Sequence, residues 1–207
     1  MKKKRPPKDK ENIAPIEDSI RQIFHEGLAS LMEALGYKLQ GSVLRKTQGE
    51  AVFLIELHTA KWNEGESGDF VINLGVHYPA LVNDILRIPA YAYLRSALEP
   101  PNLNVCAYQV RLGELWKGTD YWWHVGPESD LKVMTEQLTV VLVELGLAWL
   151  KDRQDWRCLL KEEDLSIFGL AAWRRSADGP GFAQRLTALL EREKDGARRA
   201  QLQAWGT

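Results

Sequence analysis

The chain has 207 residues, of which 45% are hydrophobic and 27% are charged, and its formal net charge at pH 7 is −1. These values are typical of a soluble globular protein that can bury a substantial core, and they disfavour a disordered or membrane-embedded chain. The two cysteines, Cys106 and Cys158, lack the spacing of a metal site or a redox pair, so we expect a reduced, cytoplasmic protein.

The N-terminus is strongly basic. Residues 1–10 carry six Lys or Arg against one Asp, which is +5, so the rest of the chain carries −6. Pro6 and Pro7 disfavour a helix, and no apolar segment of a secretory signal follows. The sequence predicts a disordered basic tail over residues 1–14, which is either simply solvated or contacts nucleic acid or an acidic partner.

Helical spacing appears first at residues 16–35, where apolar residues recur every three or four positions. Pro15 suits the first turn of a helix, and Gly36 suits its left-handed end. We therefore expect one amphipathic helix here.

Alternating apolar and polar residues then replace the helical spacing, which predicts antiparallel strands. The predicted strands cover residues 43–46, 51–59, 69–77, 105–112 and 120–125, the last pairing with the fourth across a turn at 113–119. Four prolines between residues 79 and 101 predict an irregular excursion with little helix.

Helical patterns return for the rest of the chain. One helix is expected from Ser129, as its cap, to Leu150, with a disturbance at Gly146. Its longest apolar run is too short for a membrane span of about 20 residues. Residues 153–207 read as helices separated at 176–181, with a frayed continuation after Gly196. The division predicted is a tail (1–14), an α+β domain (15–152) and a helical extension (153–207).

The two faces of the predicted sheet differ, because neighbouring residues of a strand point to opposite sides. The apolar face would carry Phe53, Ile55, Leu57, Phe70, Ile72, Leu74, Val76, Cys106, Tyr108, Val110 and Leu112. The polar face would carry Glu56, His58, Asn73, His77, Gln109 and Arg111, with Lys61 and Trp62 at its rim. We expect an α+β fold in which an antiparallel sheet of four to five strands carries helices on the apolar face.

No catalytic signature stands out. The chain lacks GxSxG, P-loop, GxGxxG and kinase patterns. Glu56 and His58 share a face and could act as an acid and base pair, and with His77 they could bind zinc, but ordinary surface residues explain them more simply. We predict no catalytic residue, no metal and no cofactor, and no membrane association.

Eight tryptophans are many for this length. Trp62, Trp116, Trp122 and Trp123 fall on or near sheet loops, where aromatic residues can form a recognition surface. Alternation places Trp122 and Trp123 on opposite sides, so at least one of them belongs to the core. Tryptophans in the helical segments are expected to be packing residues.

Several segments together resemble the bacterial domain-of-unknown-function family 4304. They are "LGYKLQG", "LHTAKWN", "FVINLGV", "RLGEL" and the "WW" pair, within about residues 22–150. The resemblance implies an α+β cytosolic domain and brings no activity, cofactor or catalytic residue. It draws attention to Lys61, Trp62, Asn63, Asn73 and Arg111. The last four also have structural explanations: Trp62 covering the sheet edge, Asn63 shaping a turn, Asn73 bonding a neighbouring strand's loop, and Arg111 pairing with Glu56.

Three functions remain open. The favoured one is a noncatalytic protein-binding module, such as an inhibitor or immunity-type partner of another bacterial protein. The second is a small-molecule-binding enzyme that uses the polar face, which requires that face to be concave. The third is a nucleic-acid-associated protein that uses the basic tail.

Overall fold

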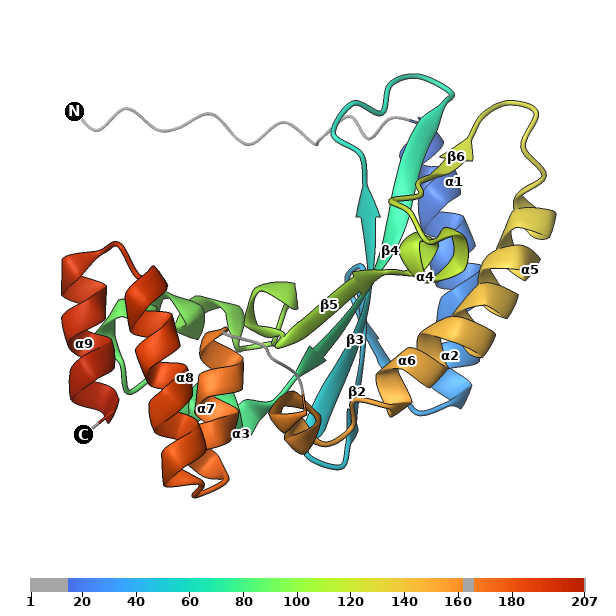
Figure 1. Ribbon diagram of the computed structural model, residues 1–207. Helices are drawn as coiled ribbons and strands as arrows, with labels where there is room; N and C mark the ends of the chain where they lie inside the picture. Colours follow the sequence, from blue (N-terminus) through green and yellow to red (C-terminus); the bar gives the residue numbers. More distant parts are fainter. Residues whose placement is uncertain (1–14, 162–165, 207) are drawn as a thin grey trace, which may run out of the picture.

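A twisted antiparallel sheet lies at the centre of the computed structural model, which describes residues 15–161 and 166–206 (Figure 1). The predicted basic tail lies outside the described residues. The strand order is β1-β2-β3-β4-β5, and β6 also pairs with β4. The strands are β1 (Lys38–Gln40), β2 (Val43–Gln48), β3 (Ala51–Thr59), β4 (Gly68–His77), β5 (Tyr108–Arg111) and β6 (Trp123–Val125). The predicted α+β fold with an antiparallel sheet is confirmed.

The predicted pairing of the last strand is wrong. β6 pairs with β4, through Phe70 opposite Trp123, and does not pair with β5. The predicted turn at 113–119 is instead mostly helix α4 (Leu112–Lys117), which ends at Gly118 with a left-handed φ of 71°. Because this helix separates the two strands, β5 and β6 lie one after the other along the same side of β4.

The strand predicted to start at Val105 begins only at Tyr108, because residues Leu103–Val105 form a 3-10 turn, η3. The turn shifts the alternation, so the prediction that Cys106 lies on the apolar face is wrong. Cys106 packs with Val43 and Leu54 on the opposite face, while Val105 joins the main core.

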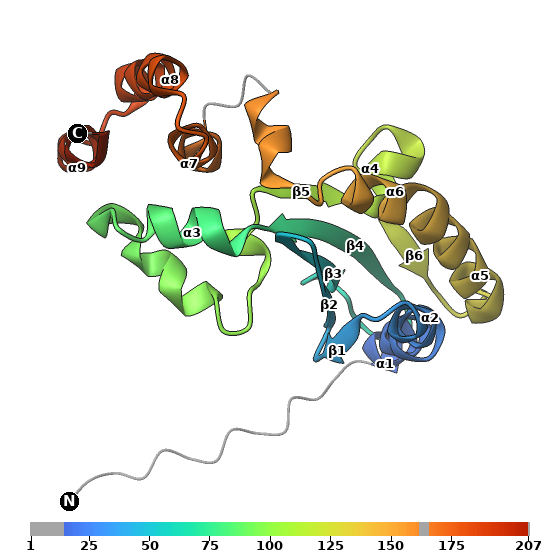
Figure 2. The same cartoon turned by 90° about the horizontal axis from the view of Figure 1, so that it is seen from below.

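Two long helices cover the apolar face of the sheet (Figure 2). The first runs through α1 (Pro15–Gln22), the π-helical η1 (Ile23–Ala29) and α2 (Ser30–Ala34), and Gly36 follows it with φ 88°. The second runs through α5 (Leu131–Val141), the π-helical η4 (Leu142–Gly146) and α6 (Leu147–Lys151). The disturbance expected at Gly146 is confirmed.

The predicted cap of the second helix is wrong by one residue. The Asp130 carboxylate accepts hydrogen bonds from the amides of Lys132 and Val133, whereas the Ser129 hydroxyl accepts one from Gly126. The joined helix Leu131–Lys151 is long and apolar enough to cross a membrane by length and composition, a test that the core helix of a soluble protein also passes. It packs one side on the sheet and leaves Val133 and Val140 exposed.

The segment after β4 is more helical than predicted, with α3 (Pro79–Ile85) and the 3-10 helix η2 (Pro89–Ala97). The C-terminal helices are η5 (Trp156–Leu160), α7 (Ile167–Arg175), α8 (Gly179–Arg192) and α9 (Gly196–Gly206). Among them, α7 packs against α3 and α9 packs against η2, away from the two long helices (Figures 1 and 2). The predicted frayed continuation is a packed helix, because Leu202 and Trp205 of α9 are buried.

Candidate functional site

Three polar residues form one row across the middle of the sheet. Glu56 of β3 lies opposite Asn73 of β4, and Asn73 lies opposite Arg111 of β5. Directly opposite residues of antiparallel strands point to the same face. The register therefore brings together three of the six side chains that alternation assigned to the polar face.

An open cleft of about 620 Å³ lies over this row. Five of the predicted site residues line it: Glu56, His58, Asn73, Gln109 and Arg111. The remaining lining residues were not predicted, and they are Asn102, Leu103, Asn104, Val110, Glu114 and Asp120. Asn102, Leu103 and Asn104 precede the predicted strand 105–112, Glu114 falls in a predicted turn, and Asp120 begins the predicted strand 120–125. Val110 was assigned to the apolar face, so none of these residues was predicted to line the cleft.

The segment around η3 forms one wall of the cleft because Gly75 leaves room for it. A Cβ atom at Gly75 would lie 2.7 Å from a methyl carbon of Leu103 and 2.8 Å from Sγ of Cys106. The Gln109 amide nitrogen holds the same segment by donating to the Leu103 carbonyl at 2.7 Å. The polar face is thus partly filled by a small apolar cluster beside the cleft.

Glu56 is half-buried at the floor of the cleft. Burial raises the pKa of its carboxyl, and a hydrogen bond from the Asn73 side chain and the nearby His58 and Arg45 act in the opposite direction. Asn73 therefore bonds a residue of the neighbouring strand itself, not of its loop. This carboxylate is less well solvated than a surface glutamate.

Arg111 forms an ion pair with Asp120. The pairing with Glu56 that was considered from the sequence is therefore wrong. The hydrogen bond from Arg111 lowers the pKa of Asp120. The Arg111 guanidinium also lies over the Trp122 ring, 5.1 Å from its centroid. Its charge is therefore compensated from two sides.

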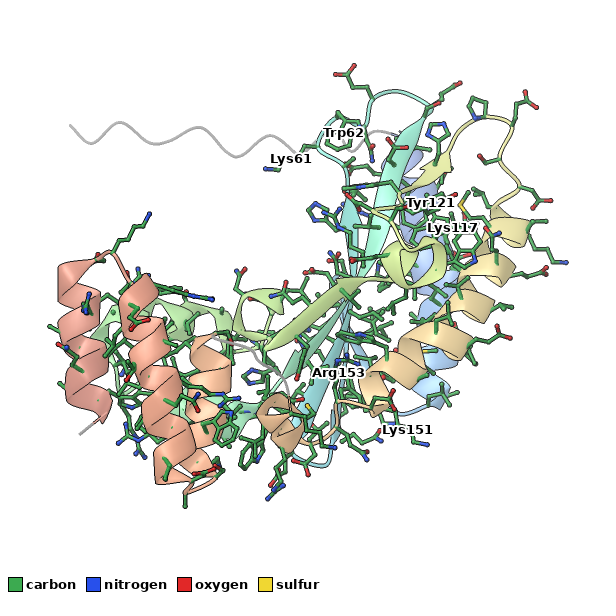
Figure 3. The ribbon with its side chains drawn as sticks, viewed as in Figure 1. Lys61, Trp62, Lys117, Tyr121, Lys151 and Arg153 are labelled. Atoms are coloured by element: carbon green, nitrogen blue, oxygen red, sulfur yellow. The ribbon has the colours of Figure 1, made fainter. Side chains whose placement is uncertain are left out.

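Trp62 stands at the rim of the polar face with 65% of its surface exposed. Its ring centroid is 5.4 Å from that of Trp122, whose ring is 6.2 Å from His58. Neighbouring Lys61 is also exposed and points away from the sheet (Figure 3). Lys61 and Trp62 thus flank the cleft without lining it.

Asp69 anchors this rim. Its carboxylate accepts a hydrogen bond from Trp62 Nε1 at 3.1 Å and lies 2.8 Å from His124 Nδ1, and these two bonds lower its pKa. Asn63 shapes the loop, because its side chain donates to the Asp69 carbonyl at 3.0 Å and accepts from the Asp69 amide at 2.8 Å. Asp69 could have been assigned to the polar face from the sequence, because it is four residues before Asn73 on the same strand. The position of His124 could not, because it follows from the pairing of β4 with β6.

His77 lies on the polar face but is buried, with Nδ1 2.9 Å from the Val105 carbonyl, and burial lowers its pKa. It does not line the cleft with Glu56 and His58. Among the described residues, no three His, Cys, Asp or Glu side chains come close enough to hold a metal ion.

The two adjacent tryptophans divide as alternation predicts. Trp123 is 1% exposed in the core, stacked between Phe70 and Trp116 with centroid distances of 6.0 and 6.1 Å. Trp122 lies on the polar face with Trp62 and Arg111. The pair therefore joins the core to the rim of the cleft.

Fold and site define an α+β protein with an antiparallel sheet, helices on one face and an open polar cleft on the other. Residues 28–152 match the family described as Domain of unknown function (DUF4304), and the chain belongs to that family. Comparison with curated proteins gave no match, and comparison with solved structures gave none either.

Proposed function

We propose that this protein is a noncatalytic binding module, an inhibitor or immunity-type protein, whose polar sheet face docks on a partner protein. The observation that carries the proposal is the pair formed by exposed Trp62 and half-buried Trp122 beside the cleft. Tryptophan and arginine are enriched among the residues that dominate the energetics of protein interfaces, and here Arg111 lies over the Trp122 ring of this pair.

The surface around this pair is organised before any partner binds. Asp69 fixes the Trp62 indole, and Asn63 fixes Asp69 through two backbone hydrogen bonds. Because these side chains are already held in place, docking costs less conformational entropy than it would for free side chains. A preorganised aromatic rim next to a polar cleft suits recognition of a folded partner or of one of its loops.

The test is affinity capture of partners from the native host with the full chain and two alanine variants. Trp62→Ala removes the rim, and Tyr93→Ala on η2 is the matched control because Tyr93 is equally exposed, at 65%. We expect a stoichiometric partner to bind the wild type and Tyr93→Ala and to be lost with Trp62→Ala. A partner that binds all three proteins alike contradicts the proposed surface.

A second candidate function rests on the concavity of the polar face. A volume of about 620 Å³ lies in the range of small-molecule sites. Glu56, whose pKa is raised by burial, and His58 would then serve as the proton-carrying pair. Thermal-shift screening of a metabolite set tests this candidate: a ligand that stabilises the wild type but not Glu56→Gln supports it, and no stabilising ligand counts against it.

A further inference from the structure

We propose that the cleft receives the side chain of an arginine from the partner protein, next to Glu56. The inference rests on the proposed binding function and specifies the chemistry of the partner. It follows from the charges and hydrogen-bonding atoms that remain uncommitted in the cleft.

The uncommitted charge of the cleft is negative. Three carboxylates and one arginine line it: Glu56, Glu114, Asp120 and Arg111. Arg111 and Asp120 pair with each other, whereas Glu56 and Glu114 form no ion pair with any residue that the structure describes. A complementary ligand group is therefore a cation.

The cleft also offers hydrogen-bond acceptors beside its carboxylates. The Gln109 amide nitrogen donates to the Leu103 carbonyl, and the Asn73 side chain donates to the Glu56 carboxylate. Each of these two amides keeps its carbonyl oxygen as an acceptor, besides a second N–H. A guanidinium carries five N–H donors and no acceptor, so it matches carboxylates and carbonyls better than an ammonium or a neutral polar group does.

Half-burial strengthens the preference for a cation at Glu56. Its carboxylate is less well solvated than a surface glutamate, so a positive charge that donates hydrogen bonds to it compensates for the solvation lost by burial. The exposed Trp62 ring at the rim offers an aromatic face on which another side chain of the partner can stack. Because Trp62 lies outside the cleft lining, a ligand that contacts both the cleft and Trp62 is larger than one amino acid, as a protein segment is.

The test is an NMR titration of the full chain with N-acetyl-arginine amide, with N-acetyl-citrulline amide as the uncharged counterpart of the same shape. We expect the arginine compound to shift the side-chain amide signals of Asn73 and Gln109 and the indole signal of Trp122. The citrulline compound should leave them unchanged, and added salt should weaken the binding.

Two conservative variants locate the charge. Glu56→Gln keeps the size of the side chain and should weaken binding of the arginine compound about tenfold or more, the usual effect of losing a hydrogen bond to a charged group. Glu136→Gln, on the exposed surface of α5, is the matched control and should leave binding unchanged. Equal binding by both variants, or equal shifts from citrulline, overturns the proposal.

Two further results separate this proposal from others. If Trp62→Ala loses the partner while Glu56→Gln keeps both the partner and its arginine response, the docking function stands and the arginine pocket is rejected. If shifts appear only after residues 1–10 are deleted, the cleft belongs to the chain's own basic segment and the assignment to a partner is overturned.

Discussion

Glu56 and Arg111 lie in the same row of the sheet, separated only by Asn73, yet they are compensated independently. Asn73 donates a hydrogen bond to the Glu56 carboxylate. The Arg111 guanidinium forms an ion pair with Asp120 and lies over the Trp122 ring. A direct ion pair would have neutralised the floor of the cleft. Its absence leaves one carboxylate there with a half-buried negative charge.

The stability of the protein should therefore depend on the protonation of Glu56. Its pKa is raised in the folded state, so the fold favours the protonated carboxyl. The resulting stabilisation is present below the ordinary pKa of glutamate and is lost as pH rises through the raised pKa. We expect Glu56→Gln to gain in free energy of unfolding relative to the wild type between pH 4 and pH 7.5.

Urea unfolding at the two pH values measures this gain, with Glu136→Gln as the surface control. A Glu56→Gln protein that is less stable than the wild type at pH 7.5 would mean that Arg45 and His58 outweigh burial. The carboxylate would then be a stabilising partner and not an uncompensated charge.

Gly75 should be intolerant of a side chain. Its Cβ position is already occupied at 2.7 Å by Leu103 and at 2.8 Å by the Cys106 sulfur. Gly75→Ala must push the wall of the cleft away from the sheet, which we expect to cost about 1–3 kcal/mol of unfolding free energy. Chemical denaturation measures the cost.

Gly179→Ala is the control for that substitution, because nothing lies within 4 Å of its Cβ position and its φ is not positive. It should change stability by less than about 1 kcal/mol, in the stabilising direction. Equal stability of the two variants would show that the segment at Leu103 moves freely over the sheet.

Alternation predicted the row of Glu56, Asn73 and Arg111 because each of these residues lies within an uninterrupted strand, where side-chain direction follows from local geometry. The same rule failed at Cys106, since the 3-10 turn at Leu103–Val105 breaks the alternation just before β5. Alternation therefore predicts the face of a side chain only within a continuous strand.

The rest of the site depends on contacts that no local pattern contains. His124 meets Asp69 only because β6 returns to β4, and that return requires α4, a helix within a segment rich in turn residues. Asp120 and Glu114 reach the cleft from the same connection. Sequence reasoning therefore found the strands of the site and missed the segments that wall it.

Alanine substitution of the two adjacent tryptophans should affect different properties: Trp123 should matter mainly for stability and Trp122 mainly for partner binding. Trp123→Ala removes a fully buried ring between Phe70 and Trp116, and we expect a loss of about 3–5 kcal/mol. Trp122→Ala removes a half-buried ring from the polar face and should cost clearly less. Paired denaturation curves make the comparison.

Capture of the partner gives the second half of that test. Trp122→Ala should lose the partner although it stays folded, because Trp62 and Arg111 both rest on this ring. If Trp122→Ala keeps the partner and is as destabilised as Trp123→Ala, the Trp122 ring is a packing residue and the docking surface lies elsewhere.

Any affinity for nucleic acid should come from the basic N-terminal segment and not from the sheet face. Residues 1–10 carry +5, whereas the cleft has three carboxylates against one arginine. Retention of the full chain on immobilised single-stranded DNA should therefore fall with rising salt and disappear on deletion of residues 1–10. The double variant Trp62→Ala, Trp122→Ala should elute like the wild type, since stacking on these rings would require phosphates to approach Glu56 and Glu114. Earlier elution of the double variant would instead assign the aromatic rim to base stacking, and it would contradict a cleft selective for cations.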